Sequence, residues 1–379
     1  MSNTLTNLAG DIYIAADIVG RELTGASSSV TRNATAERAA VGDTVRSFFT
    51  NQATAITPTP SMTIPEGTDQ TVGNKTLTIN NDRAVQIPWR GEEIRSVNNG
   101  SGFETIYGDQ IRQAMRTIAN EIESSILVEA YKNASRAVGT AGTTPFGSDF
   151  DTVAEARQVL VDNGTPTDNQ VTMVLNTLAG TKLRNLAQLQ KVNEAGGGDL
   201  LRQGALLDLQ GIMLKESAGV QSHTKGTGVN YDTNGALAVG ATVITADTGT
   251  GTVLPGDVVT FAGDAVNKYV VVKAFASGSF EIASPGLRVA IADGNDIVVG
   301  NNYTGNVVFH RAALELAMRP PAKPAGGDAA VDELLVQDPN SGLVFLVSSY
   351  IGYRKAMFEV AAVWGVKAFK PDFIATVMG

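Results

Sequence analysis

The chain of 379 residues is long enough for two or three domains, each able to bury a hydrophobic core. Its 43% hydrophobic and 18% charged residues are typical of a folded protein and exclude a disordered one. The 29 basic and 38 acidic residues give a net charge of −9, which argues against binding of duplex nucleic acid through a basic surface. The lack of cysteine excludes disulfides, thiolate catalysis and cysteine-based metal sites.

The first ninety residues predict an arm and a loop. Apolar residues at near-helical spacing between residues 5 and 23 predict an amphipathic helix, too short to be stable unless it docks. Acidic residues interrupt this stretch, and no apolar run approaches the roughly 20 residues of a membrane-spanning helix, so we expect a soluble intracellular product without a secretory signal. Residues 24–38, rich in Ser, Thr and Ala, predict little regular structure. Prolines break residues 48–90, where Lys75–Ile79 and Val85–Ile87 predict two arms of a long hairpin or extended loop.

The segment from Phe103 to Arg136 predicts one long α-helix. At about 1.5 Å per residue it is roughly 50 Å long, which exceeds the diameter of an ordinary compact domain. Glycines flank it at Gly100, Gly102 and Gly139. Because its apolar residues lack the seven-residue repeat of a coiled coil, we expect a helix that spans an extended body. The residues of the apolar stripe are Phe103, Ile106, Tyr107, Ile111, Ala114, Met115, Ile118, Ile122 and Ile126.

An α/β body is expected after this helix. Ser148 is a candidate cap for its first helix, and Asn163 with Gly164 is a candidate stop. The predicted elements are a helix, a buried strand, a second helix and a final apolar segment, at residues 150–160, 171–175, 178–190 and 211–214.

From about residue 229 to residue 309 the pattern becomes all-β, as in a small barrel or sandwich. The phrase Leu254–Phe261 is typical of a tight turn that leads into a barrel strand. The predicted strands are 242–245, 257–261, 269–275, 280–283, 287–291, 297–299 and 307–309. The remaining expectations are a helix, a stiff proline linker and closing strands, or a strand and a helix, at residues 311–318, 320–327, 331–347 and 356–366.

No catalytic constellation stands out. His223 and His310 lack a second histidine or a helical glutamate at metal-ligand spacing, so we expect His310 to be a packing or hydrogen-bonding residue. The glycine groups do not have the spacing of a phosphate-binding loop. Two carboxylate pairs exist, but neighbours one or two residues apart on a helix or strand point in different directions. We therefore expect that the chain is not an enzyme and binds no cofactor or metal. The pairs are Glu92 with Glu93 and Glu121 with Glu123.

Three short stretches carry a resemblance to a known family, and so does the order of the predicted parts. The stretches are Gly256–Gly263 (GDVVTFAG), Phe309–Ala313 (FHRAA) and Ala361–Pro371 (AAVWGVKAFKP). They resemble the major capsid (coat) protein of tailed bacteriophages, and more narrowly the short-tailed Salmonella-phage type with an insertion domain. The resemblance implies an α+β chain with the Hong Kong 97-like fold.

In that fold the chain would divide into an N-terminal arm, an extended loop, the spine helix of a peripheral domain, an axial α/β domain, an inserted all-β barrel-like domain, and a return to the axial and peripheral domains. The corresponding ranges are 1–47, 48–98, 99–140, 141–228, 229–309 and 310–379.

The resemblance implies a subunit that self-assembles through hexamers and pentamers into an icosahedral shell around a phage DNA genome. The shell would form in the host bacterial cytoplasm as a scaffold-assisted procapsid that expands on packaging, and would end in the virion. Its partners would be a scaffolding protein, a portal and double-stranded DNA that is not strongly bound, with no membrane. Asp11, Asp17 and Glu22 are candidates for the scaffold contact. We expect Lys75, in the extended loop, to be solvated rather than cross-linked.

The shell hypothesis also gives the flanking glycines a role, because a closed shell needs curvature and glycines allow the backbone to flex. Gly100, Gly102 and Gly139 are candidate hinges at the two ends of the long helix. Two other classes of function stay open at this stage. One is a receptor- or carbohydrate-binding virion protein that uses the β-domain, and the other is a hydrolase with a β accessory domain. The long helix favours the shell, because no repeat of constant period typical of a binding fibre is present.

Overall fold

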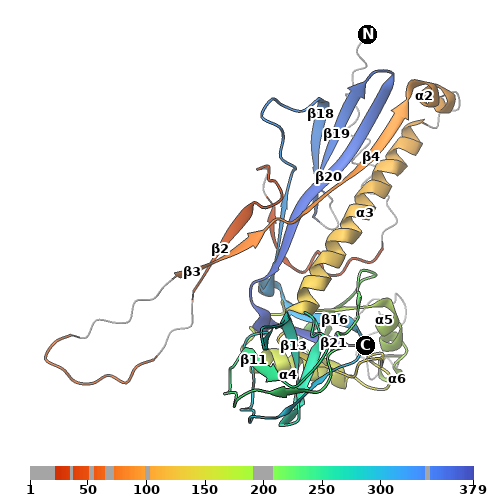
Figure 1. The fold of residues 1–379 in the computed structure, drawn as a ribbon. Coiled ribbons are helices and arrows are strands. Elements are labelled where there is room, and N and C mark those ends of the chain that lie inside the picture. The colour runs from red at the N-terminus through yellow and green to blue at the C-terminus, as the bar shows by residue number, and fades with distance from the viewer. Residues whose placement is uncertain are drawn as a thin grey trace.

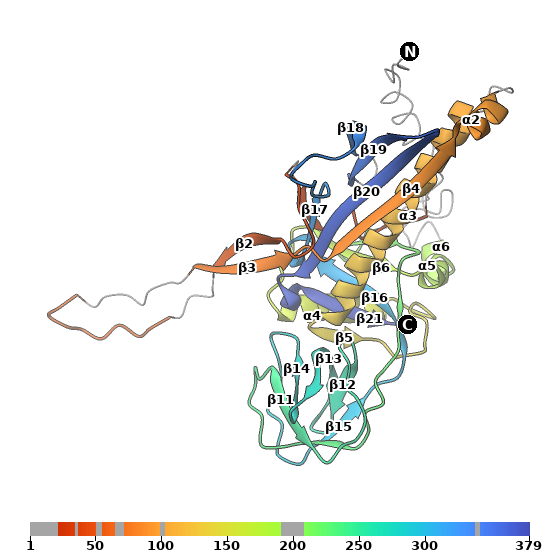
Figure 2. The ribbon, with the colours of Figure 1, turned by 45° about the horizontal axis from the view of Figure 1, so that its top comes forward.

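The computed structural model describes residues 22–34, 37–50, 55–64, 72–98, 103–190, 208–337 and 342–379. The molecule is an elongated α+β structure, in which one long helix, α3, runs beside a long β-sheet (Figure 1). A second sheet and a group of short strands lie at the C-terminal end of that helix. A two-stranded arm projects sideways from the body (Figures 1 and 2).

The predicted long helix is present as α3, Phe103–Lys132, and spans 30 residues. Its described stripe residues, from Ile111 to Ile126, are buried as expected. The helix ends at Lys132 rather than at Arg136, because the chain turns into a sheet: Ser135 donates its N–H to the carbonyl of Ile374, and Arg136 begins strand β5, Arg136–Val138. A short helix, α2, Gly91–Asn98, precedes α3.

The first sheet has six strands and lies along α3. Its order is β1, β17, β20, β19, β18, with β4 on the other edge of β20. The segments 331–347 and 356–366 therefore contribute closing strands, one of the two expected outcomes. The bounds are β1 Thr31–Ala34, β4 Asn81–Arg90, β17 Leu314–Arg319, β18 Ala330–Gln337, β19 Val344–Gly352 and β20 Lys355–Ala368.

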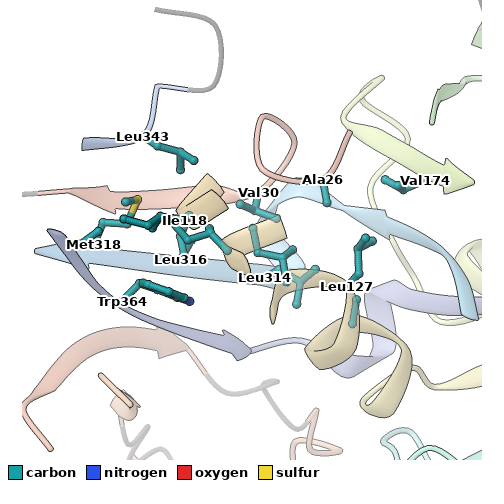
Figure 3. Packing of buried hydrophobic residues seen from close by; sticks show 14 of the residues in the cluster. Ala26, Val30, Ile118, Leu127, Val174, Leu314, Leu316, Met318, Leu343 and Trp364 are labelled. Carbon is teal, nitrogen blue, oxygen red and sulfur yellow. The ribbon is translucent and has the colours of Figure 1, made fainter. Parts of the chain in front are cut away.

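The main core lies between α3 and this sheet. Leu314 and Leu316 of β17 and Trp364 of β20 meet Ile118 and Leu127 of the helix (Figure 3). Burial of each such side chain stabilises the fold by about 1.5–3 kcal/mol. The apolar stripe is therefore an ordinary core face that fixes the helix on the sheet.

The expected helix at residues 311–318 is wrong. Only Arg311–Ala313 form one 3-10 turn, and the chain then enters β17, where all six side chains are buried. Leu316 and Met318 face the α3 core, whereas Ala317 belongs to a small cluster on the opposite face. All six residues of β17 are strong helix formers, which favoured a helix, although Leu314, Leu316 and Met318 alternate with Glu315, Ala317 and Arg319 as in a strand.

Of the two arrangements expected at residues 75–87, a long hairpin or an extended loop, the hairpin is wrong. The strand β3, Val72–Thr78, pairs with β2, Thr44–Thr50, in an antiparallel arm, whereas β4 pairs with β20. Asn81 and Asp82 already belong to β4, so only Ile79 and Asn80 connect the two sheets. The hydrophobic pattern indicated both strands, but the pattern of one strand does not identify its partner.

The expectation of little regular structure at residues 24–38 is wrong as well. Residues Thr31–Ala34 form β1, which pairs in parallel with β17. Ala26 and Val30 are buried in the main core (Figure 3). The segment has few apolar residues, and its side-chain and backbone hydrogen bonds to the body are not visible as a sequence pattern.

The second sheet and its helices form the expected α/β body. Helix 150–160 and strand 171–175 are confirmed as α4, Asp151–Asp162, and β6, Val171–Leu175. Asn163 and Gly164 end α4 as expected, but Phe150 rather than Ser148 precedes it, without a side-chain cap. The segment 178–190 splits into two helices. The other elements are α5 Thr177–Arg184, α6 Ala187–Gln190, β7 Asp208–Leu209, β8 Ile212–Glu216, β9 Ser222–His223, β16 Tyr303–His310, η2 Pro371–Phe373 and β21 Ile374–Met378.

Short antiparallel strands between residues 231 and 299 share a hydrophobic cluster of their own, and we call them the β-unit (Figure 2). Residues 287–291 form no strand, although Leu287 and Ile291 are buried there. The expected last strand, 307–309, lies in β16 of the second sheet instead. The strands are β10 Tyr231–Thr233, β11 Val243–Asp247, β12 Val258–Phe261, β13 Asp264–Ala276, β14 Ser279–Ile282 and β15 Asp296–Val299.

Candidate functional site

The arm formed by β2 and β3 projects from the body (Figures 1 and 2). Its strands pair over seven residues, from Thr44 opposite Thr78 to Thr50 opposite Val72. Residues 55–64 near its tip are extended and exposed, and carry no charged residue. Met62 and Ile64 are fully open to solvent, at 105% and 96% of their maximal area. Apolar side chains held away from their own body mark a surface for contact with another molecule.

The root of the arm is anchored firmly. Leu77 and Ile79 are buried against the first sheet. Gly365 of β20 lies so close that a Cβ atom there would sit 2.4 Å from the carbonyl oxygen of Thr78. The arm is therefore fixed at its root and free of the body at its tip.

Lys75 does not have the solvated position expected for it. Its Nζ donates to the carbonyl oxygen of Phe369, and the side chain is partly buried at the root of the arm. Burial lowers the pKa of Lys75, as do Lys367 and Lys370, while Asp372 raises it. The lysine therefore fastens the arm to the chain after β20.

Of the three candidate scaffold contacts, Asp11 and Asp17 lie outside the described residues. Glu22 is already engaged within the subunit. Its carboxylate accepts from Arg116 of α3 at 2.6 Å and from Asn120 one turn further on. Any external cation that binds Glu22 must compete with Arg116.

Of the three candidate hinges, Gly100 and Gly102 lie outside the described residues. Gly139 follows β5 with a φ of +80°, and a Cβ atom there would lie 3.0 Å from the carbonyl oxygen of Met378. Its own carbonyl accepts from Nζ of Lys268. The site requires glycine for its conformation and close packing; its role as a hinge stays a prediction.

Both histidines have carboxylate partners. His310 is buried, lies 3.0 Å from Asp168 through Nε2, and accepts from the N–H of Ala312 through Nδ1, as expected of a packing and hydrogen-bonding residue. His223 Nε2 lies 2.8 Å from Oδ1 of the buried Asp257. Asp257 also accepts from two backbone N–H groups. Its charge is thus satisfied within the fold.

The carboxylate pairs of the sequence do not converge. Glu121 is exposed and pairs with Arg83 at 3.0 Å, whereas Glu123 is buried and points elsewhere. Glu93 accepts from the N–H of Arg90. Among the described residues no group of three or more histidine and acidic side chains is placed to hold a metal ion, and no described helix is both long and apolar enough to cross a membrane.

A socket around Tyr131 joins the end of α3 to the β-unit, and the sequence analysis missed it. The Tyr131 ring lies 5.6 Å from the ring of His223 and 6.3 Å from that of Tyr303. Tyr303 donates its hydroxyl to the carbonyl of Gly256 at 2.6 Å, and burial raises its pKa. A Cβ atom on Gly256 would touch the Tyr131 ring at 2.9 Å. The turn of the Leu254–Phe261 phrase was the available signal, but its partners are distant in sequence.

These elements define an α+β fold with a long helix on a long sheet, a second sheet at its end and a projecting arm. No family model and no curated protein matches the chain. Among solved structures the chain is similar to the capsid of cyanophage P-SCSP1u, with 11% identity, a TM-score of 0.51, and coverage of 95% of this chain and 89% of that one.

Two further phage structures are similar at lower scores. The structure from Mycobacterium phage Che8 has 12% identity and a TM-score of 0.47, over 89% of this chain and 84% of that one. The mature capsid of bacteriophage PhiM1 has 11% identity and a TM-score of 0.47, over 93% and 85%. The similarity to the cyanophage structure shows that the fold is that of a phage capsid protein.

Proposed function

We propose that this chain is a major capsid protein that self-assembles into the shell around a phage genome. The observation that carries the proposal is the arm, an anchored hairpin whose tip presents Ile56, Met62 and Ile64 to solvent. The shared fold with the cyanophage capsid supports it. A shell subunit works through distributed contact area and needs no catalytic group, which agrees with a structural, non-enzymatic role. The tip would lie on a neighbouring copy.

The proposed architecture is Hong Kong 97-like. In it, α3 and the first sheet form the peripheral domain, the second sheet forms the axial domain, and the β-unit is an inserted barrel-like domain. The ranges are those expected from the sequence: the N-terminal arm at 1–47, the extended loop at 48–98, the spine helix at 99–140, the axial domain at 141–228, the insertion at 229–309 and the return at 310–379. The N-terminal arm of this division is not the β2–β3 arm, most of which falls in the extended loop. The separate hydrophobic cluster of the β-unit supports its treatment as an insertion.

The proposed assembly is a shell of hexamers and pentamers, built in the host cytoplasm with a scaffolding protein and a portal, which expands on packaging and becomes part of the virion. The net charge of −9 supports a shell that encloses DNA without gripping it. Asp11, Asp17 and Glu22 remain the proposed scaffold contacts. Gly100, Gly102 and Gly139 remain the proposed hinges.

Electron microscopy of the purified protein, with and without a co-expressed scaffold, tests this function. We expect closed shells or capsomers. Persistent monomers under both conditions would overturn the proposal, as would a discrete trimer that binds a receptor.

A variant of the arm tests whether its exposed apolar tip is needed for assembly. Replacing Ile56, Met62 and Ile64 with Ser removes the apolar contact without touching the core, so we expect a folded subunit that no longer assembles. The matched control replaces Val266, Val239 and Val331, which are also exposed, with Ser. Shells from the arm variant in normal yield would contradict the role of the tip.

A further inference from the structure

Residues 22–34 lie as a strap across the middle of α3, strand β8 and the edge of the first sheet. Glu22 is bound to Arg116 at one end, and β1 pairs with β17 at the other. Between them the strap passes so close to β8 that a Cβ atom on Gly25 would lie 2.9 Å from the carbonyl of Glu216. The strap therefore packs as a distinct segment on the surface formed by α3, β8 and β17.

A buried carboxylate fastens the centre of the strap. Glu123 of α3 is only 1% exposed. Its Oε1 accepts the N–H of Ala26 at 2.7 Å, and its Oε2 accepts the N–H of Ser27 at 2.8 Å. A carboxylate on the core side of a long helix is expensive to bury unless both oxygens are satisfied. Here the strap satisfies both oxygens, although Ala26 and Glu123 are 97 residues apart in the sequence.

The other contacts of the strap are also mainly polar. Lys215 Nζ donates to the hydroxyls of Ser28 and Ser29 at 2.8 Å. Thr31 donates its hydroxyl to the carbonyl of Arg311 at 3.0 Å, whereas the two hydrogen bonds from Arg32 to the carbonyl of Ser27 lie within the strap itself. The apolar side chains that the strap buries are those of Ala26 and Val30. Segments with little buried apolar area open locally at a lower free energy than the core.

We propose that residues 22–34 detach from the body as a unit while the rest of the subunit stays folded, and that Glu123 is the latch that holds them. Detachment uncovers the guanidinium of Arg116 and one edge of β17, since β1 is the strand that covers that edge. An uncovered edge can pair with a strand of another molecule. The strap thus controls access to this edge, and the inference does not depend on whether the subunit forms a shell.

Hydrogen exchange of the full-length subunit tests the proposal in two ways. In the wild type we expect the amides of Ala26 and Ser27 to exchange at least a hundredfold faster than the slowest amides of β20. Equal rates would mean that the strap opens only on global unfolding, and would overturn the proposal. This measurement stands even where a variant fails to fold.

The second test replaces Glu123 with Gln, which keeps the shape of the side chain. Its amide oxygen can accept one of the two backbone N–H groups, but its NH2 group then faces the other N–H and cannot accept from it. We expect exchange at Ala26 and Ser27 to rise at least tenfold, with β20 unchanged and trypsin cleavage at Arg32 accelerated. The matched control is Glu121→Gln, two residues away on the exposed face of the same helix. Exchange within twofold of wild type in the Glu123 variant, or an equal effect of both variants, would overturn the latch.

Discussion

At the scale of single residues, α3 carries two carboxylates on its covered side, and they are satisfied differently. Glu123 accepts two backbone hydrogen bonds from the strap, whereas Glu129 accepts one, from the N–H of Ala368 at 3.2 Å. Burial raises the pKa of Glu129; the hydrogen bond from Ala368 and the charges of Lys367 and Lys132 lower it, but do not offset burial. The fold therefore favours the protonated form of Glu129.

The consequence is a pH-dependent loss of stability that Glu129→Gln removes. The folded pKa lies above the unfolded value of about 4.3, so the fold loses stability as pH rises from about 4 through the raised pKa. We expect the free energy of unfolding of the variant to exceed that of the wild type increasingly between pH 4 and pH 7, and the difference to be constant below pH 4. Urea unfolding across this range measures it, with Glu121→Gln as an exposed control; a difference that shrinks as pH rises would contradict the argument.

At the scale of elements, the sequence predicted those whose pattern is local. Helix α3 shows its stripe of isoleucines, and β6 is a short apolar run between turns. The prediction failed for β17, whose six residues are all strong helix formers, and for the partner of β3, which is fixed by contacts across the chain. An extended loop could be expected from the prolines, whereas the strap rests on hydrogen bonds between residues about a hundred positions apart.

The contact between the arm and β20 illustrates such a long-range requirement. A Cβ atom at Gly365 would lie 2.4 Å from the carbonyl of Thr78 and 2.8 Å from a methyl carbon of Leu77. We expect Gly365→Ala to displace the root of the arm and to destabilise the subunit by about 1–3 kcal/mol, as overpacking does. Urea unfolding measures the loss, and hydrogen exchange over residues 72–78 locates it. Gly352→Ala in the same sheet, where the nearest atom is 3.7 Å away, is the control and should change little; equal effects would refute the steric reason.

At the scale of the whole molecule, several contacts join the β-unit to the body. One is the Tyr131 socket. Strand β13 pairs with β5, and Arg136 of β5 donates to Asn267 of the β-unit at 2.9 Å and to the carbonyl of Val159 in α4. Arg288 of the β-unit donates to the carbonyl of Asp162 at the end of α4. Several separate contacts fix the orientation of a body more firmly than one. The β-unit can therefore act as a brace, although its own cluster supplies its core.

Removal of the β-unit separates these two roles. The N–H of Lys225 donates to the side chain of Asn302 at 2.9 Å, so the ends of the excised segment are adjacent and residue 225 can be joined directly to residue 302. Because the α3 core draws mainly on other elements, we expect the shortened chain to keep its helix and first sheet by circular dichroism, with a lower Tm since His223 and Tyr303 lose partners. We also expect it to assemble poorly. Loss of all native secondary structure would show that the β-unit belongs to the folding core and is not an insertion, whereas normal shells at full yield would show that it braces nothing.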